Sequence, residues 1–228
     1  MKKNNLILGT FLAITAILFS SCGASSSSDS TSTEKVEGST ESTESSGVVT
    51  IGSQVWTSKN IDVATYRNGD VIPQVQDENA WENLTTGAWC YYDNDASNGT
   101  KYGKLYNWYA VNDPRGLAPN GYHIPTDAEW TQLSDYLGDG EAGTKMKSTS
   151  GWNNNGNGTN SSGFSGLPGG HRSANGAFSF IGYNGYWWSS TENDTNDAWY
   201  RVLYYDDGVV YRSANFKEFG FSVRCLRD

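Results

Sequence analysis

The stretch from residue 121 to residue 138 contains the best-specified helix start in the chain. Thr126 and Glu129 stand three positions apart, the spacing of a capping box in which each side chain accepts a hydrogen bond from the other residue's backbone N–H. Trp130, Leu133 and Leu137 follow at i, i+3 and i+7, and a glycine comes next. The spacing predicts a helix over 127–137 with one face in a hydrophobic core.

The rest of the chain is poor in helix signals. Its 228 residues include 9 Trp, 14 Tyr, 8 Phe and 26 Gly but only 2 Met, which is typical of short strands joined by tight turns. We expect five closely spaced strands over 178–181, 186–190, 198–205, 209–213 and 220–225. Asp207-Gly208 predicts a two-residue hairpin loop that places Tyr204 opposite Tyr211. Both faces of this hairpin are partly aromatic, so the pattern does not show which face is exposed.

The N-terminus has the features of a bacterial lipoprotein signal. Lys2 and Lys3 precede an apolar run over 6–19, which is too short to span a bilayer, and small residues then lead to Cys22. We expect residues 1–21 to be a signal peptide, Cys22 to carry lipid, 22–47 to be a disordered Ser/Thr/Glu tether, and 48–228 to be the folded domain. An ordinary cleaved signal peptide is the alternative. The predicted location is the cell envelope, on the outer membrane.

The net charge of −9 argues against nucleic acid as a partner. An exported protein folds in an oxidising compartment, where two cysteines are more often bridged than free. We therefore predict a disulfide between Cys90 and Cys225, with two buried thiols as the alternative.

Several blocks of the chain resemble a known family, the Fibrobacter succinogenes major paralogous domain, over residues 48–228. The blocks are ATYRNGDVIP, AWCYYDND, YGKLYNWYAV, GYHIPTDAEW, GYWWSST and GFSVRCLRD. The resemblance implies an α+β, C-type-lectin-like domain with short helices and a small, twisted, mostly antiparallel sheet in which the two ends of the domain meet. It also implies a relationship to sulfatase-modifying-factor domains. It implies a fold and not an activity.

Tests for enzymatic chemistry give little support to catalysis. Sulfatase-modifying enzymes of this kind hold copper with two cysteines near the C-terminal strands, whereas Cys90 lies far back in this chain. Iron-dependent relatives need clustered histidines, and this chain has only His123 and His171. We interpret His123 as structural and expect His171 to be the more exposed of the two.

One segment resembles the start of a calcium loop, with Asp93 and Asp95 as candidate ligands. Lys104 stands where the twelfth position of an EF-hand requires Glu. We interpret the segment as a polar turn and expect no cofactor, with calcium as the alternative.

The predicted function is that of a lipid-anchored, non-catalytic module that binds a glycan or a protein. The alternatives are an enzyme of the sulfatase-modifying-factor type and a structural envelope lipoprotein. Aromatic rings beside amides and carboxylates suit such ligands, and the predicted ligand surface consists of Trp188, Asn193, Asp194, Asn196, Asp197, Arg201, Tyr205 and Arg212. If the other hairpin face is exposed, Tyr204 and Tyr211 replace Tyr205 and Arg212.

Overall fold

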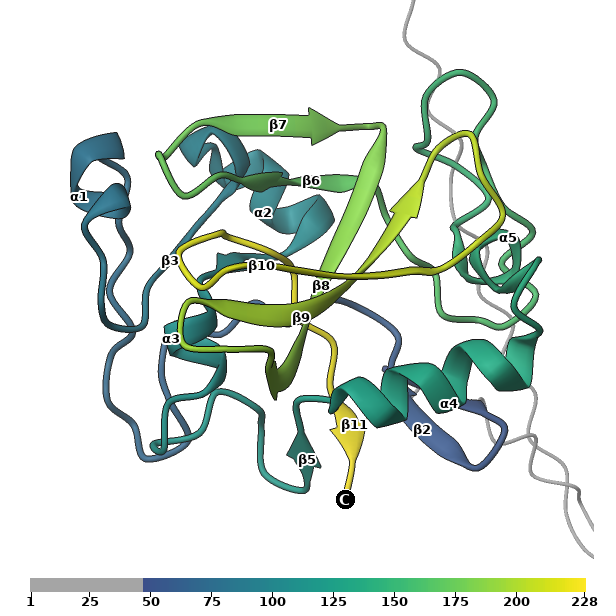
Figure 1. Ribbon diagram of the computed structural model, residues 1–228, viewed down its shortest axis with the longest axis horizontal. Helices are drawn as coiled ribbons and strands as arrows, with labels where there is room; N and C mark the ends of the chain where they lie inside the picture. The colour runs from purple at the N-terminus through teal and green to yellow at the C-terminus, as the bar shows by residue number, and fades with distance from the viewer. Residues whose placement is uncertain (1–46) are drawn as a thin grey trace, which may run out of the picture. The chain divides into compact units, whose positions relative to one another are not determined.

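The computed structural model describes residues 47–228, which fold as an α+β domain (Figure 1). The predicted signal peptide, Cys22 and nearly all of the predicted tether lie outside the described residues. Within the described part of the chain, no helix has the length and apolar character needed to cross a membrane.

Strands from both ends of the domain share a four-stranded sheet. Its order is β1 (Val48–Ile51), β2 (Gln54–Thr57), β11 (Leu226–Arg227) and β5 (Tyr122–His123). β11 runs antiparallel to β2 on one side and to β5 on the other. The two ends of the domain therefore meet in one sheet, as expected.

A mixed five-stranded sheet forms the centre of the domain. Its order is β10 (Tyr211–Phe216), β9 (Asp197–Tyr204), β8 (Asn184–Glu192), β6 (Gly169–Arg172) and β7 (Phe178–Ile181). β6 is parallel to β8, and the other pairs are antiparallel. A separate two-stranded pair joins β3 (Trp89–Cys90) to β4 (Leu105–Tyr106).

The helices are short except for the one that the capping box predicts. They are α1 (Glu78–Glu82), α2 (Ala96–Tyr102), α3 (Trp108–Val111), α4 (Asp127–Leu137) and α5 (Ala142–Met146), with a 3₁₀ turn η1 at Tyr92–Asn94. Both hydrogen bonds of the Thr126–Glu129 capping box are present at α4. Figure 1 shows α4 beside β2, β5 and β11, where the Trp130 ring lies 4.8 Å from that of Trp56. The predicted helix is confirmed.

The central strands β8 and β9 are covered on both faces. Even-numbered side chains, including Trp188 and Val202, join one core cluster around Phe221. Odd-numbered side chains, including Trp187 and Leu203, join a second cluster with the apolar face of α4. Because side chains alternate along a strand, a strand buried on both sides shows no polar face in its sequence.

The register of the β9–β10 hairpin differs from the prediction. Tyr211 lies opposite Val202 and not Tyr204, so the connection is longer than the two residues of Asp207-Gly208. The buried Lys147 ammonium donates to the backbone carbonyls of Tyr204, Tyr205 and Asp207 at 2.8–3.2 Å. These bonds hold the chain in a wide loop, 205–210, instead of a tight turn.

The ends of the other predicted strands also need correction. Residues 220–225 make isolated bridges and not a continuous strand, and the last strand is Leu226–Arg227. β6 was not predicted, because two of its four residues are glycines.

The predicted disulfide is not formed. Cys90 and Cys225 are free, buried thiols. Cys90 belongs to a cluster around Trp81, whereas Cys225 belongs to the cluster around Phe221. Each cysteine is thus a small apolar core residue in a different part of the interior.

Candidate functional site

The predicted ligand surface does not form one site, because two of its members belong to the core. The Trp188 side chain is fully buried and its indole N–H donates to the carbonyl of Tyr106 at 2.9 Å. Arg201 is 2% exposed and donates to the Asp127 carboxylate at 2.7 Å. Both assignments to the ligand surface were wrong. Trp188 packs in the core cluster around Phe221, whereas Arg201 bonds to the N-terminus of α4.

Arg212 joins the same ion-pair cluster from the solvent side. Its Nε lies 2.9 Å from the Asp127 carboxylate, and its guanidinium stacks 3.3 Å from the centroid of the Trp199 ring. Burial raises the pKa of Asp127, but bonds to Arg212 and Arg201 outweigh it and leave the pKa below its ordinary value. These residues clamp the N-terminus of α4 onto β9 and β10.

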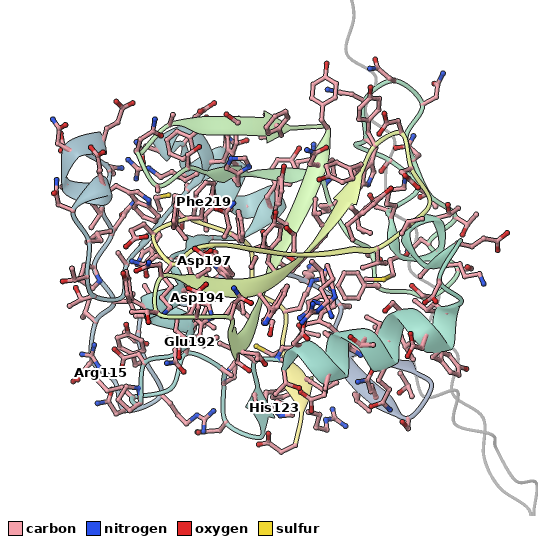
Figure 2. The ribbon with its side chains drawn as sticks, in the orientation of Figure 1. Arg115, His123, Glu192, Asp194, Asp197 and Phe219 are labelled. Carbon is pink, nitrogen blue, oxygen red and sulfur yellow. The ribbon has the colours of Figure 1, made fainter. Side chains whose placement is uncertain are left out.

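The four polar residues of the loop between β8 and β9 do lie together. Asn193, Asp194 and Asn196 are exposed, and Asp197 is half-buried. Asp194 Oδ1 accepts from the backbone N–H groups of Asn196 and Asp197 at 2.8 and 2.9 Å. Figure 2 shows Glu192, Asp194 and Asp197 at this end of the central sheet. The carboxylate that was predicted to bind a ligand is used to shape the loop.

Beneath this loop lies the buried Lys217. Its ammonium pairs with the Glu192 carboxylate and donates to the Thr195 carbonyl at 2.6 Å. It also lies 5.1 Å from the centroid of the Trp108 ring. The loop is therefore held by the bonds of Lys217 as well as by its own hydrogen bonds to Asp194.

Tyr205 lies at the other end of β9. The eight residues of that strand separate it from the Asp197 loop by roughly 25 Å at the usual rise per residue. There it borders a concave site of about 540 Å³, which we call the aromatic pocket. Its lining residues are Phe180, Tyr183, Asn184, Tyr186, Tyr204, Tyr205 and Asp206.

The aromatic pocket combines exposed rings with fixed polar groups. Phe180 is 53% exposed and Tyr183 is 38% exposed. The Tyr183 and Tyr205 rings meet edge to face with centroids 5.3 Å apart. Asn184 donates to the Tyr186 hydroxyl at 2.8 Å, which fixes both groups. Five aromatic side chains, an amide and a carboxylate thus converge from β7, the 182–183 turn, β8, β9 and the 205–210 loop.

Phe180 has an unusual backbone. Its φ is +66°, in the left-handed region that bulky side chains rarely adopt. Gly170 lies on β6 between the residues that pair with Ile181 and Ser179, and it also has a positive φ. Backbone atoms of β7 lie 2.6–2.7 Å from where a Cβ of Gly170 would be. A bulky apolar side chain that is both strained and exposed is a feature typical of functional sites.

His171 lies behind this pocket and is buried, contrary to expectation. Its ring centroid is 4.8 Å from that of Tyr186 and 5.7 Å from that of Phe180. Burial lowers the pKa of His171 to about 4, so the imidazole is neutral at physiological pH. Within residues 47–228 its Nδ1 has no hydrogen-bond partner. Its role is to support the aromatic rings.

The two candidate calcium ligands, Asp93 and Asp95, have different structural roles. Asp95 caps α2 by accepting from the Ser97 N–H at 2.8 Å. Asp93 is exposed and has a φ of +52° inside the 3₁₀ turn. No group of three or more His, Cys, Asp or Glu side chains within the described residues is arranged to hold a metal ion.

Sequence reasoning identified part of the aromatic pocket. Tyr205 belonged to the predicted surface and Tyr204 to its alternative, but Phe180, Tyr183 and Asn184 were missed. The available signal was the segment FSFIGYNGY, in which aromatic residues flank a glycine turn between two predicted strands. Alternation alone could not show that these rings remain exposed.

The fold and the pocket define an α+β domain that presents an aromatic cleft at one end of a mixed sheet. The model of the Fibrobacter succinogenes major domain matches residues 49–227, and the chain belongs to this family. No curated protein matches the chain.

Proposed function

We propose that this chain is a non-catalytic binding module of the bacterial cell envelope, anchored by lipid at Cys22, whose aromatic pocket binds a saccharide. In this proposal the fold is of the C-type-lectin-like kind. The observation that carries the proposal is the exposed Phe180–Tyr183 pair beside Asn184 and Asp206. Aromatic faces stack on the apolar faces of sugar rings, while amides and carboxylates bind hydroxyl groups.

The state of the cysteines supports binding over copper chemistry. Burial raises the pKa of Cys90 to about 12 and that of Cys225 to about 12. Both thiols are buried away from solvent. They also lie in different core clusters.

The test is binding of the purified protein to an array of glycans and cell-wall polysaccharides. We expect saturable binding to saccharides and a roughly ten-fold loss of affinity in Phe180→Ala and in Tyr183→Ala, since each change removes a stacking face. Phe216→Ala is the matched control, because Phe216 is also 53% exposed but lies on β10 outside the pocket. Equal losses in Phe180→Ala and Phe216→Ala, or no binding at all, would contradict the proposal.

The anchor has a separate test. Cys22→Ala removes the sulfur that would carry lipid, so we expect the protein to leave the membrane fraction. The measurement is the distribution of the protein between membrane and soluble fractions, with Cys90→Ala as the control. Membrane association unchanged by Cys22→Ala would show that residues 1–22 were misread.

A further inference from the structure

A second pocket, of about 670 Å³, opens on a different part of the domain. β1, the 58–62 segment, the C-terminal part of α2 and the 163–167 loop form its walls. Its volume is in the range of small-molecule sites. Because its lining shares no residue with the aromatic pocket, it is a distinct site. We call it the Arg224 pocket.

Arg224 borders this pocket and is 1% exposed. Its guanidinium donates to three neutral oxygens: Asn60 Oδ1 at 2.7 Å, the Thr57 carbonyl at 2.7 Å and the Ser165 carbonyl at 3.2 Å. A guanidinium has five N–H donors, so two have no acceptor among residues 47–228. No carboxylate of the described residues pairs with it.

Three other buried cations of the domain differ from Arg224 in having a counter-ion. Lys104, Arg201 and Lys217 each pair with a carboxylate. Arg172 and Lys147 bond only to carbonyls, but neither of them lines the pocket. Like Arg172, which lies over Trp81 and Phe178, the Arg224 guanidinium lies over an aromatic ring, 4.4 Å from the centroid of Phe164. A buried charge without a counter-ion is costly, because its loss of hydration is not offset.

The charged side chains of the pocket lining that have no ion-pair partner among the described residues are all positive. Lys59 and Lys101 are exposed at the lining and make no ion pair within the described residues. The one acidic lining residue, Asp62, is paired with Lys104. The pocket is thus locally positive in a chain of net charge −9. Burial lowers the pKa of Arg224 to about 9, which leaves the guanidinium charged at neutral pH.

We infer that the Arg224 pocket binds an oxyanionic group, a carboxylate or a sulfate, carried by a small ligand. The two free N–H donors of Arg224 would bind the oxyanion, because guanidinium groups match the geometry of such oxygens. Lys59 and Lys101 would attract it to the pocket. This inference does not depend on sugar binding at the aromatic pocket.

The test uses isothermal titration of the full chain with sodium glucuronate and inorganic sulfate, with glucose and sodium chloride at equal ionic strength as controls. We expect saturable binding of an oxyanion and none of glucose. Stronger binding of glucuronate would identify a carboxylate as the ligand group, and stronger binding of sulfate would identify a sulfate. Absence of both would overturn the inference.

Four variants test whether binding occurs in this pocket. Lys59→Gln/Lys101→Gln changes exposed residues and is expected to fold and to weaken binding at least five-fold. Arg227→Gln removes an exposed cation elsewhere and is the control. Phe180→Ala is expected to leave oxyanion binding unchanged, which separates this inference from the proposed function. Arg224→Lys is expected to abolish binding if it folds. Equal effects of the Lys59/Lys101 change and of Arg227→Gln would refute the inference.

Discussion

At the scale of single residues, the backbone conformation of Phe180 lowers the stability of the domain. A non-glycine residue in the left-handed region loses about 1–2 kcal/mol relative to its preferred conformation. A bulky residue kept there is explained most simply by the ring it presents at the aromatic pocket. Variants without the Phe180 side chain therefore show whether this residue contributes to saccharide binding, to stability or to both.

We expect Phe180→Gly to be more stable than Phe180→Ala by about 1 kcal/mol, since only glycine adopts a positive φ without strain. Both variants lack the ring, so both should lose saccharide binding. Urea denaturation measures the difference in the free energy of unfolding. If alanine were the more stable of the two, the backbone at this position would not be strained.

His123 makes the stability of the fold depend on pH. Its Nδ1 lies 2.8 Å from Asp228 and its Nε2 lies 3.0 Å from Glu129 (labelled His123 in Figure 2). Burial lowers its pKa, but the hydrogen bonds to Asp228 and Glu129 outweigh burial and raise the pKa above 6.5. The protonated form thus favours the folded state.

The stabilisation by His123 is complete below the unfolded pKa of 6.5 and is lost as pH rises through the higher folded pKa. We expect the melting temperature to fall in that window, and His123→Gln to remove the fall. Thermal melts at several pH values above 6.5 measure it. The buried His171 acts in the opposite direction and only below pH 6.5, since its folded pKa is about 4. An unchanged slope in His123→Gln would assign the pH dependence to another group.

At the scale of elements, the loop between β8 and β9 depends on Asp194. Bonds from the N–H groups of Asn196 and Asp197 stabilise its carboxylate and lower its pKa. We expect Asp194→Ala to lower the urea midpoint, and Asn196→Ala to leave it unchanged because no hydrogen bond uses the Asn196 side chain within the described residues. Equal midpoints in the two variants would mean that Lys217 alone holds the loop.

Elements with local signals could be predicted from the sequence, and elements set by distant contacts could not. The ends of α4 follow from Thr126, Glu129 and Gly138, which all lie within the helix or next to it. The register of β9 and β10 depends on Lys147, which is about sixty positions earlier in the chain. The same limit applies to the site, because burial of Trp188 and Arg201 depends on α3, α4 and β4.

At the scale of the whole molecule, Cys90 and Cys225 form no disulfide, so noncovalent contacts stabilise the described domain. We expect neither Cys90 nor Cys225 to react with an alkylating reagent in the native protein, because burial raises the pKa of each to about 12. Both should react after denaturation without reductant, and reductant should not change the melting temperature. Peptide mapping of alkylated protein is the measurement. Thiols that become reactive only after reduction would restore the predicted bridge.

The sheet that joins β2 to β11 also sets the order in which the domain can be completed. Leu226 pairs with Trp56, so β2 cannot pair with β11 until about 170 more residues have been synthesised. Contacts between such distant positions form slowly, because the closing of a long loop precedes any gain from pairing. The emerging chain therefore keeps this edge of β2 unpaired until β11 has been made.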